Sequence, residues 1–521
     1  MSEVVDQSLQ KIAKGTGIIF IGTIIGMLLA FLGRVLVARS FTQTEYGIYS
    51  LALVLLNIFV TISLFGLQDG AARQIGYYRG RNDSLKVKGI IFSSIQIVLI
   101  ASIISSILLF FASDILSTKI FHDPALTAPL KVLAFAIPFL ALTQLFVSIF
   151  RGFESVKEKV YFQDILRNVL FPAFLIPVVI LGLPFIDAIY AFAASIIITF
   201  VAFAFYVLKK IPLSLRDSKS NLLATNPVGK ELFFFSIPLL GVYLLNQIMN
   251  WTDTLTLGFF KTSKMVGLYN GAAPIAGLIG IILSSVGFIY VPVISQLYSK
   301  NQLSEIDRGY KVLTKWILSI TLPIFLIVFL FPEAVLSFLF GFRYTEAAFT
   351  LQILALGFFI HALMGPNGAT LIITGKTRFL MWSTFVVVVT NIILNIALIP
   401  IFGIAGAAFA TTSALAMKNI FWSVKLYYTF KIHPFTKNYL KPVAASVIPI
   451  LLIYMLVNHL LSATSFWILP LFLILFLVVY SLSILFTRSF DREDIFMLLT
   501  LERRLELDLT VVKNVLKEFI K

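Results

Sequence analysis

The sequence contains no cysteine, so it offers no disulfide, no thiol nucleophile and no cysteine ligand for a metal. Charged residues are also scarce: Asp, Glu, Lys and Arg make up only 13% of the chain, whereas soluble domains have about 25%. The sequence has no phosphate-binding Gly-Lys-Ser/Thr loop, no His-Glu-x-x-His pair and no spaced carboxylates that would hold a catalytic metal. We therefore expect no enzyme activity, no cofactor, no metal site and no intrinsic ATP hydrolysis.

Apolar residues, in contrast, make up 59% of the 521 residues, and the mean hydropathy is +0.97. A soluble core cannot hide this much apolar surface, but lipid can, and a spanning helix needs about 20 apolar residues. The sequence therefore predicts an all-α integral membrane protein. The first apolar run is long enough to span, and acids and lysines precede it, so we do not expect a cleavable signal.

Fourteen apolar segments are predicted to span the membrane, in groups of six, six and two. They are residues 15–37, 46–65, 89–112, 130–150, 166–183, 186–208, 232–260, 266–294, 316–331, 347–374, 379–399, 403–426, 442–461 and 466–486. The chain then divides into an amphipathic N-terminal segment (1–14), a first six-helix lobe (15–208), a polar linker (209–230), a second six-helix lobe (231–428), two extra helices (429–487) and a helical tail (488–521).

The distribution of basic residues predicts the orientation of these helices. With both termini in the cytoplasm, and with Lys131 and Lys425 at the very ends of their spans counted with the adjacent loops, 32 of the 41 Lys and Arg residues lie in cytoplasmic segments, six lie in outer segments and three lie inside spans. This bias is typical of membrane proteins, whose cytoplasmic loops are rich in Lys and Arg. The net charge of +16 is therefore not expected to mark a nucleic-acid partner, and the linker and tail are expected to be cytoplasmic.

The two six-helix groups look like copies of one another. The motif EYGIY at 45–49 follows the first span, and MVGLY at 265–269 follows the seventh span, 220 residues later. Six is an even number, so the two copies share one orientation, and such repeats place a substrate site between two lobes related by a pseudo-two-fold axis. Chance alignment of apolar segments is the alternative interpretation.

Arg34 is a charged residue inside the first predicted span, about one turn from its outer end. Burying such a charge costs roughly 2.5 to 3.5 kcal/mol on insertion scales, so it usually faces a cavity or a partner. Arg34 either lines a substrate cavity or extends to the outer headgroups. Because Arg39 already supplies a cation at the membrane surface, cavity lining is the interpretation that we favour.

The seventh span carries three polar residues on one helical face, Asn246, Asn250 and Asp253, at positions i, i+4 and i+7. They either line a cavity or join helices through hydrogen bonds, and the carboxylate favours the cavity. The repeat places Asp253 and Arg34 at nearly equal depth on equivalent helices. We therefore expect these two residues to form part of an outer gate when the cavity faces the cytoplasm.

Several other polar residues are weaker candidates. Asn57 on the second span, Asn270 on the eighth and Lys418 on the twelfth are candidate cavity residues. His361 is expected to be a hydrogen-bonded structural residue. Asp69 with Arg73 and Asp164 with Arg167 are expected to form ion pairs near the cytoplasmic surface.

Three segments resemble known transporters. Residues 34–49 (RVLVARSFTQTEYGIY) resemble the first-span signature of the Wzx-like polysaccharide flippases of the MOP superfamily, which also contains the MurJ and MATE branches. Residues 253–258 (DTLTLG), followed by 266–269, are similar to the second-lobe pattern of that family. Residues 66–73 (GLQDGAAR) look like the end of its second span.

This resemblance implies a V-shaped, two-lobed helical bundle with a central cationic cavity. It also implies a substrate, an oligosaccharide on a polyprenyl (pyro)phosphate lipid, that is moved from the inner to the outer leaflet by alternating access. Arg34 is then suited to bind the phosphate, because a guanidinium binds phosphate oxygens in bidentate fashion. Other expected partners are membrane lipids, a coupling ion (H⁺ or Na⁺) and glycan-assembly proteins, and the expected location is the cell membrane.

Two alternatives remain open. The first is a cation-coupled drug or metabolite antiporter of the related MATE branch, which would rely on buried acids; acids are nearly absent from the spans of the first lobe. The second is a membrane scaffold for a glycan-assembly complex, which would have no cavity and would not move lipids.

The topology can be tested because the chain has no cysteine of its own. A single cysteine introduced by Ser218→Cys in the linker is expected to resist an impermeant thiol reagent in intact cells and to react after the membrane is opened. Labelling from outside intact cells would show that the linker is not cytoplasmic.

Overall fold

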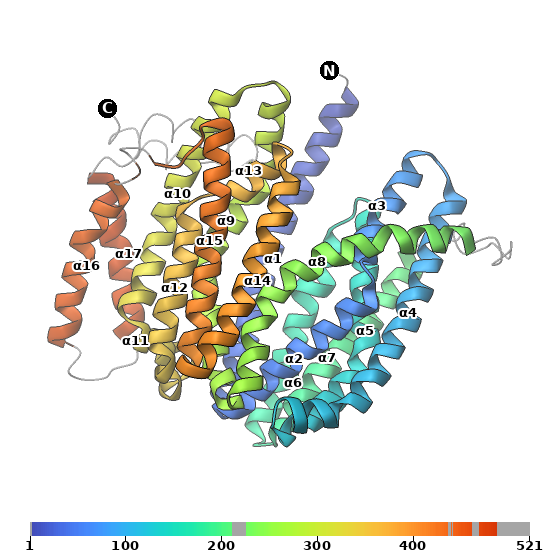
Figure 1. Cartoon of the computed structure of the whole chain (residues 1–521), viewed down its shortest axis with the longest axis horizontal. Coiled ribbons are helices and arrows are strands. Elements are labelled where there is room, and N and C mark those ends of the chain that lie inside the picture. Colours follow the sequence, from blue (N-terminus) through green and yellow to red (C-terminus); the bar gives the residue numbers. More distant parts are fainter. Residues whose placement is uncertain (1–2, 211–225, 436–438, 440, 461–467, 487–521) are drawn as a thin grey trace. The chain divides into compact units, whose positions relative to one another are not determined.

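The computed structural model describes residues 3–210, 226–435, 439, 441–460 and 468–486, and the regular elements of this part of the chain are helices, without strands (Figure 1). The all-α prediction is therefore confirmed. The chain forms two compact units, Met1–Asn270 and Gly271–Lys521.

The first unit contains eleven elements and the first turns of a twelfth among its described residues. They are α1 (Glu3–Ser40), α2 (Gln43–Leu64), α3 (Leu67–Gly80), α4 (Ser84–Ile115), η1 (Leu116–Ile120), η2 (Pro124–Leu126), α5 (Thr127–Gly152), η3 (Lys159–Leu166), α6 (Arg167–Ile180), α7 (Phe185–Lys210), α8 (Asn226–Phe260) and the start of α9 (Ser263–Ser299).

Helix α5 is the centre of this unit. It packs against α2, α3, α4 and α7, and α4, α5 and α7 can be followed side by side in Figure 1. Leu130, Leu133 and Ile137 of α5 are fully buried. Neighbouring helices replace lipid around α5, so its position fixes the rest of the unit.

Local sequence explains where α2 begins and ends. Thr42 and Glu45 form a capping box: the Thr42 hydroxyl accepts a hydrogen bond from the Glu45 amide at 3.2 Å, and the Glu45 carboxylate accepts one from the Thr42 amide at 2.8 Å. The helix ends where Phe65 and Gly66 both adopt positive φ. A Cβ at Gly66 would lie 2.2 Å from the carbonyl oxygen of Ser236 on α8, so only glycine allows this approach.

Helix α1 packs against η3 and α6, and glycines make this contact close. A Cβ at Gly22 would lie 2.2 Å from the Val160 side chain, and one at Gly26 would lie 2.9 Å from the backbone oxygen of Asp164. Small residues let the backbones of membrane helices approach in this way. The element η3 is a π-helix, a wider helix with i to i+5 hydrogen bonds.

The second unit, taken by itself, is also a helical bundle. Its elements are the rest of α9, α10 (Leu303–Leu330), α11 (Pro332–Phe340), η6 (Phe342–Ala347), α12 (Ala348–Leu363), α13 (Asn367–Ile373), α14 (Thr377–Phe402), α15 (Ile404–Phe430), α16 (Lys441–Leu460) and α17 (Ile468–Phe486). Helix α12 packs against α10 and α15, and α15 packs against α14. The extra helices α16 and α17 pack on each other and on α10, where the Tyr480 hydroxyl donates to the Ser319 carbonyl at 2.9 Å.

Each predicted span overlaps a helix. Ten segments of the described residues are long and apolar enough to span a membrane, so the exact number of fourteen spans stays a prediction, as do the proposed domain boundaries. Helix α1 runs without a break from Glu3 to Ser40, although the sequence indicated a separate amphipathic segment at 1–14. The tail at 488–521 and most of the linker lie outside the described residues.

The predicted tenth span, 347–374, is two helices rather than one. Helix α12 ends at Leu363 and α13 begins at Asn367. Pro366 has no amide hydrogen to donate, and Gly365 adopts a φ of 64°. A Cβ at Gly365 would lie 2.2 Å from the Thr314 hydroxyl of α10, so the break also lies in close contact with α10.

The two copies of the repeated motif contact each other reciprocally within the first unit. A Cβ at Gly47 would lie 1.7 Å from the Ser263 carbonyl oxygen and 2.9 Å from the Gly267 nitrogen. A Cβ at Gly267 would lie 1.9 Å from the Gln43 carbonyl oxygen and 3.0 Å from the Gly47 nitrogen. Each glycine therefore contacts the residue four positions before the other, as expected for a two-fold contact between equivalent segments. The first turns of α2 and α9 therefore touch backbone to backbone at Gly47 and Gly267, and we call this contact the glycine crossing.

The crossing predicts a marked sensitivity to a single methyl group. Gly267→Ala is expected to destabilise the protein by about 1–3 kcal/mol or more, because α2 and α9 must move apart. Gly241→Ala on α8 is the matched control, since a Cβ there meets nothing within 4 Å. Thermal unfolding in detergent is the measurement, and equal stability of the two variants would contradict the crossing.

Candidate functional site

A buried polar cluster joins α8 to α9 in the first unit. The Tyr269 hydroxyl donates to Asp253 Oδ2 at 2.5 Å, and the two residues are 3% and 5% exposed. One position further along each helix, Asn270 Nδ2 donates to the Thr254 hydroxyl at 3.1 Å. A buried carboxylate is costly unless hydrogen bonds satisfy it, and the Tyr269 hydroxyl supplies one such bond.

Contacts with the first repeat hold this cluster in place. The Tyr46 hydroxyl on α2 donates to the Asn270 carbonyl at 3.2 Å. The Ser263 hydroxyl, at the start of α9, donates to the carboxylate of Asp123, which caps η2. The cluster therefore lies beside the glycine crossing and is attached to residues of both repeats.

Asn250 and Asn57 each make a hydrogen bond to a residue other than Asp253. Asn250 is exposed and donates to Gln247 at 3.1 Å. Asn57 donates to the Leu53 carbonyl of its own helix at 2.7 Å. The side chain of Asn246 lies outside the part of the chain that the structure describes. Among the described side chains of the predicted polar face on α8, the Asp253 carboxylate is buried and the Asn250 amide is exposed.

Arg34 and Arg39 are exposed side chains of α1. The Arg34 guanidinium interacts electrostatically with the hydroxyls of Tyr46 and Tyr49. The described residues contain no ion pair between Arg34 and Asp253, whose carboxylate accepts the Tyr269 hydroxyl instead. The gate between Arg34 and Asp253 stays a prediction about another state of the protein.

Lys418 belongs to the second unit, on α15, and is partly buried. Its ammonium lies 5.2 Å from the centre of the Trp422 ring and interacts electrostatically with His361. His361 Nδ1 lies 3.1 Å from Asn419 Oδ1, which also accepts a hydrogen bond from Asn367 at 3.2 Å. His361 is thus hydrogen-bonded, as expected.

Sequence reasoning missed this network. Asn367 and Asn419 are 1% and 0% exposed, and the Asn367 amide also donates to Ser423 at 3.0 Å. Pro366 was the available signal, because a break in a buried helix leaves backbone groups that nearby polar side chains can satisfy.

Both expected interfacial ion pairs have different partners from those predicted. Asp69 pairs with Arg151 of α5 at 2.6 Å, and Asp164 pairs with Lys159 at 2.7 Å. Asp69 pairs with Arg151 because α3 packs against α5. Asp164 pairs with Lys159 because both residues lie on the π-helix η3.

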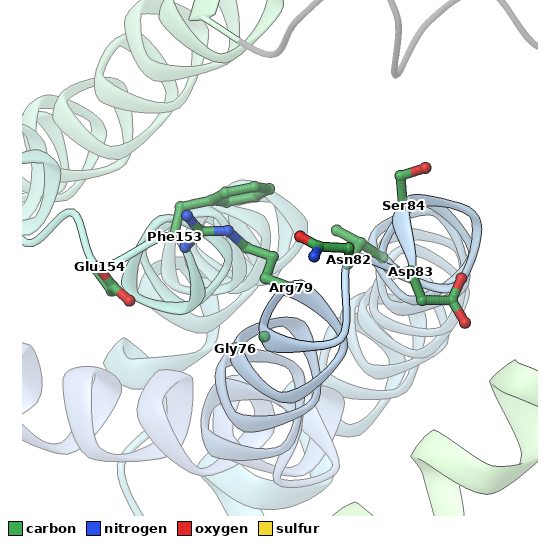
Figure 2. A pocket seen from close by; sticks show the side chains of 9 residues that line it. Gly76, Arg79, Asn82, Asp83, Ser84, Phe153 and Glu154 are labelled. Atoms are coloured by element: carbon green, nitrogen blue, oxygen red, sulfur yellow. The ribbon is translucent and has the colours of Figure 1, made fainter.

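A hollow of about 450 Å³ lies where α3 ends, α4 begins and α5 ends, and Figure 2 shows its lining. It contains none of the predicted site residues. Arg79 donates to the Gly152 carbonyl at 3.2 Å, and its guanidinium lies 5.0 Å from the centre of the Phe153 ring. Asp83 caps α4 by accepting the Lys86 amide. These contacts join three helix ends.

Two family models match the chain. Residues 12–298, more than half of the chain, match the model described as polysaccharide biosynthesis protein, and residues 238–397 match the model described as MatE. These matches cover the segments whose resemblance was noted in the sequence.

Two curated relatives align over most of their length. An uncharacterised membrane protein of Methanocaldococcus jannaschii is 24% identical over 425 residues, which cover 79% of this chain and 83% of that protein. A probable low-salt glycan biosynthesis flippase of Haloferax volcanii, Agl15, is 26% identical over 412 residues, which cover 78% of this chain and 82% of that protein.

A solved structure is similar in fold. The lipid II flippase MurJ in an inward closed conformation superposes with a TM-score of 0.70 at 18% identity, covering 89% of this chain and 98% of that chain. Together with the apolar helices, these likenesses show a multi-pass membrane protein of the predicted fold.

Double-mutant cycles can separate the observed contact of Asp253 from the predicted one. Asp253→Ala and Tyr269→Phe are expected to be non-additive in thermal stability by about 1.5–3 kcal/mol, because either change removes the same hydrogen bond to a carboxylate. Asp253→Ala and Arg34→Ala are expected to be non-additive in transport if the gate forms. Additive effects of the second pair on transport would rule out the gate, and additive effects of the first pair on stability would contradict the cluster.

Proposed function

Because this chain belongs to the polysaccharide biosynthesis protein family, we propose that it is a flippase for a lipid-linked oligosaccharide. It moves an oligosaccharide on a polyprenyl (pyro)phosphate from the cytoplasmic to the outer leaflet by alternating access, for the synthesis of a surface glycan. The family match over residues 12–298 carries this proposal, and the name of the relative Agl15, a probable glycan biosynthesis flippase, supports it.

Physical chemistry constrains how such a substrate crosses. Its sugars and phosphate need a polar, water-accessible path, because an unpaired charge is costly in hydrocarbon. Its polyprenyl tail is apolar and stays in lipid throughout. A helical protein therefore has to supply cations and hydrogen-bond donors for the head group and leave the tail outside.

We assign the phosphate contact to Arg34 and Arg39 on α1. Both side chains are exposed, and a guanidinium presents a planar fork that matches phosphate oxygens. Asn57, Asn250, Asn270 and Lys418 are proposed to contact the substrate as it moves, and Asp253 is proposed to act in the gate.

The proposed location is the cell membrane, with both termini and the linker in the cytoplasm, as the distribution of basic residues predicts. An H⁺ or Na⁺ gradient, the membrane potential or consumption of the product drives the cycle, because the sequence has no nucleotide-binding motif. Glycan-assembly proteins that supply or remove the substrate are proposed partners.

A second candidate function is cation-coupled export of a drug or metabolite. The MatE model matches residues 238–397, and Asp253 is a buried acid within that range. Export of a small cation by proteoliposomes, without movement of lipid-linked oligosaccharide, would favour this candidate.

The flippase proposal predicts a measurable activity. Proteoliposomes that contain the purified protein are expected to make a fluorescent polyprenyl-diphosphate oligosaccharide accessible to an impermeant quencher faster than empty liposomes do. Arg34→Ala is expected to slow this by about tenfold or more, since charged hydrogen bonds contribute about 1.5–3 kcal/mol. Arg34→Lys keeps the charge and is expected to be milder. Wild-type rates in both variants, at equal reconstitution, would remove Arg34 from the site.

A further inference from the structure

Arg167 is the first residue of α6, directly after the π-helix η3, and its expected partner is engaged elsewhere. Asp164 Oδ2 accepts a hydrogen bond from Lys159 Nζ at 2.7 Å and one from the Thr23 hydroxyl at 3.4 Å. Lys159 precedes Asp164 by five residues, which is the spacing that the i to i+5 hydrogen bonds of a π-helix bring together. Arg167 interacts electrostatically with Asp164 but makes no ion pair or hydrogen bond with the described residues.

The contact between α1 and η3–α6 brings Arg34 to the same region. Asn168, the residue after Arg167, donates to the Gly26 carbonyl at 3.0 Å. A Cβ at Gly33, the residue before Arg34, would lie 3.1 Å from the Phe171 ring. The two arginines therefore extend from two helices whose backbones are fixed against each other.

Both guanidinium groups lie near one tyrosine of α2. Arg34 and Arg167 each interact electrostatically with the Tyr49 hydroxyl. Tyr49 is 3% exposed, and its ring stacks on Phe171 with a centroid distance of 6.2 Å and meets Phe192 edge-on at 5.8 Å. The ring is thus held firmly, while its hydroxyl makes no hydrogen bond within the part of the chain that the structure describes.

The charges of this group do not balance. Arg34, Arg167 and Lys159 are three cations. The carboxylate with which these cations make an electrostatic contact or an ion pair is that of Asp164. Holding cations together in helices surrounded by lipid is unfavourable unless an anion accompanies them. An anion with several acceptor oxygens would take hydrogen bonds from both guanidinium groups and from the Tyr49 hydroxyl.

We propose that Arg34, Arg167 and Tyr49 form a binding site for a lipid-linked phosphate or diphosphate group within the first unit. This inference rests on the proposed flippase function and adds Arg167 and Tyr49 to its substrate contacts. The two arginines bind the phosphate oxygens from the neighbouring helices α1 and α6, and the Tyr49 hydroxyl donates a further hydrogen bond to the phosphate. Asp164 stays paired with Lys159 and positions η3 without touching the ligand.

The test measures binding rather than transport. Full-length protein in detergent is titrated with a polyprenyl diphosphate, and the bound fraction is determined by native mass spectrometry. Arg167→Ala and Arg34→Ala are each expected to weaken binding by about tenfold to a hundredfold, as loss of charged hydrogen bonds does. Arg167→Lys should recover part of the loss, because it keeps the charge without the fork. Tyr49→Phe should weaken binding less than either arginine variant.

Two controls separate this site from a structural role of Arg167. Asp164→Asn keeps the shape of the side chain and removes the negative charge near Arg167, so binding of the polyprenyl diphosphate should be unchanged or tighter. If Asp164→Asn instead weakened binding as much as Arg167→Ala does, the Asp164–Arg167 interaction would matter only for folding, and the proposed site would be overturned. Arg79→Ala removes an exposed arginine of the same unit that packs on Phe153, and binding should be unchanged.

Titrations with other lipids identify which kind of phosphate lipid the site binds. Polyprenol without phosphate should bind weakly and equally to all variants. Phosphatidylglycerol that competes as well as the polyprenyl diphosphate would overturn the substrate assignment and identify a general lipid headgroup site. Normal binding and flipping by Arg167→Ala would refute this inference alone. Arginine-dependent binding by a protein that flips no lipid-linked oligosaccharide would refute the proposed function and leave the site standing.

Discussion

The close backbone contact between the first turns of α2 and α9 is the interaction on which the polar cluster of the first unit depends. Gly47 and Gly267 occupy the same position in the two repeats, and each allows the backbone of the other helix to approach within van der Waals distance. The capping box of Thr42 and Glu45 fixes the first turn of α2, so the crossing fixes where that turn lies. Tyr46 precedes Gly47 by one residue, and Asn270 follows Gly267 by three. Their mutual hydrogen bond is therefore a consequence of the crossing.

The crossing also places one tyrosine of each repeat, and the two repeats use it differently. Tyr49 and Tyr269 each follow the crossing glycine by two residues, and both are 3% exposed. Tyr269 donates to Asp253 of α8, whereas Tyr49 lies near Arg34 of α1. A phenol hydroxyl donates equally well to a carboxylate and to a phosphate oxygen. In the second repeat the chain itself supplies the acceptor, the Asp253 carboxylate. In the first repeat, the phosphate of the proposed ligand would be the acceptor for Tyr49.

Hydrophobicity predicted the positions of the helices well, because a span needs only a run of apolar residues. The repeated glycine motif indicated a duplication, and the structure shows that its two glycines also contact each other. Partners of polar residues were harder to predict. The pairing of Asp69 with Arg151 joins two helices far apart in sequence, and helical spacing alone suggested Arg73. The break at Pro366 was visible, but the network of Asn367 and Asn419 depends on how α13 packs against α15. Sequence spacing describes neighbours on one helix and says little about neighbours on another.

The π-helix η3 shows why the role of Arg167 could not be seen in the sequence. In an α-helix, residues three apart are neighbours, so Asp164 and Arg167 would face each other. The wider turn of a π-helix makes residues five apart neighbours instead, and Asp164 meets Lys159. The close contact of α1 with η3 has a separate cause, because Gly22 and Gly26 of α1 let the two backbones approach. The local departure from regular helix geometry therefore directs Asp164 to Lys159, and in the proposed site this leaves the Arg167 guanidinium for an anion.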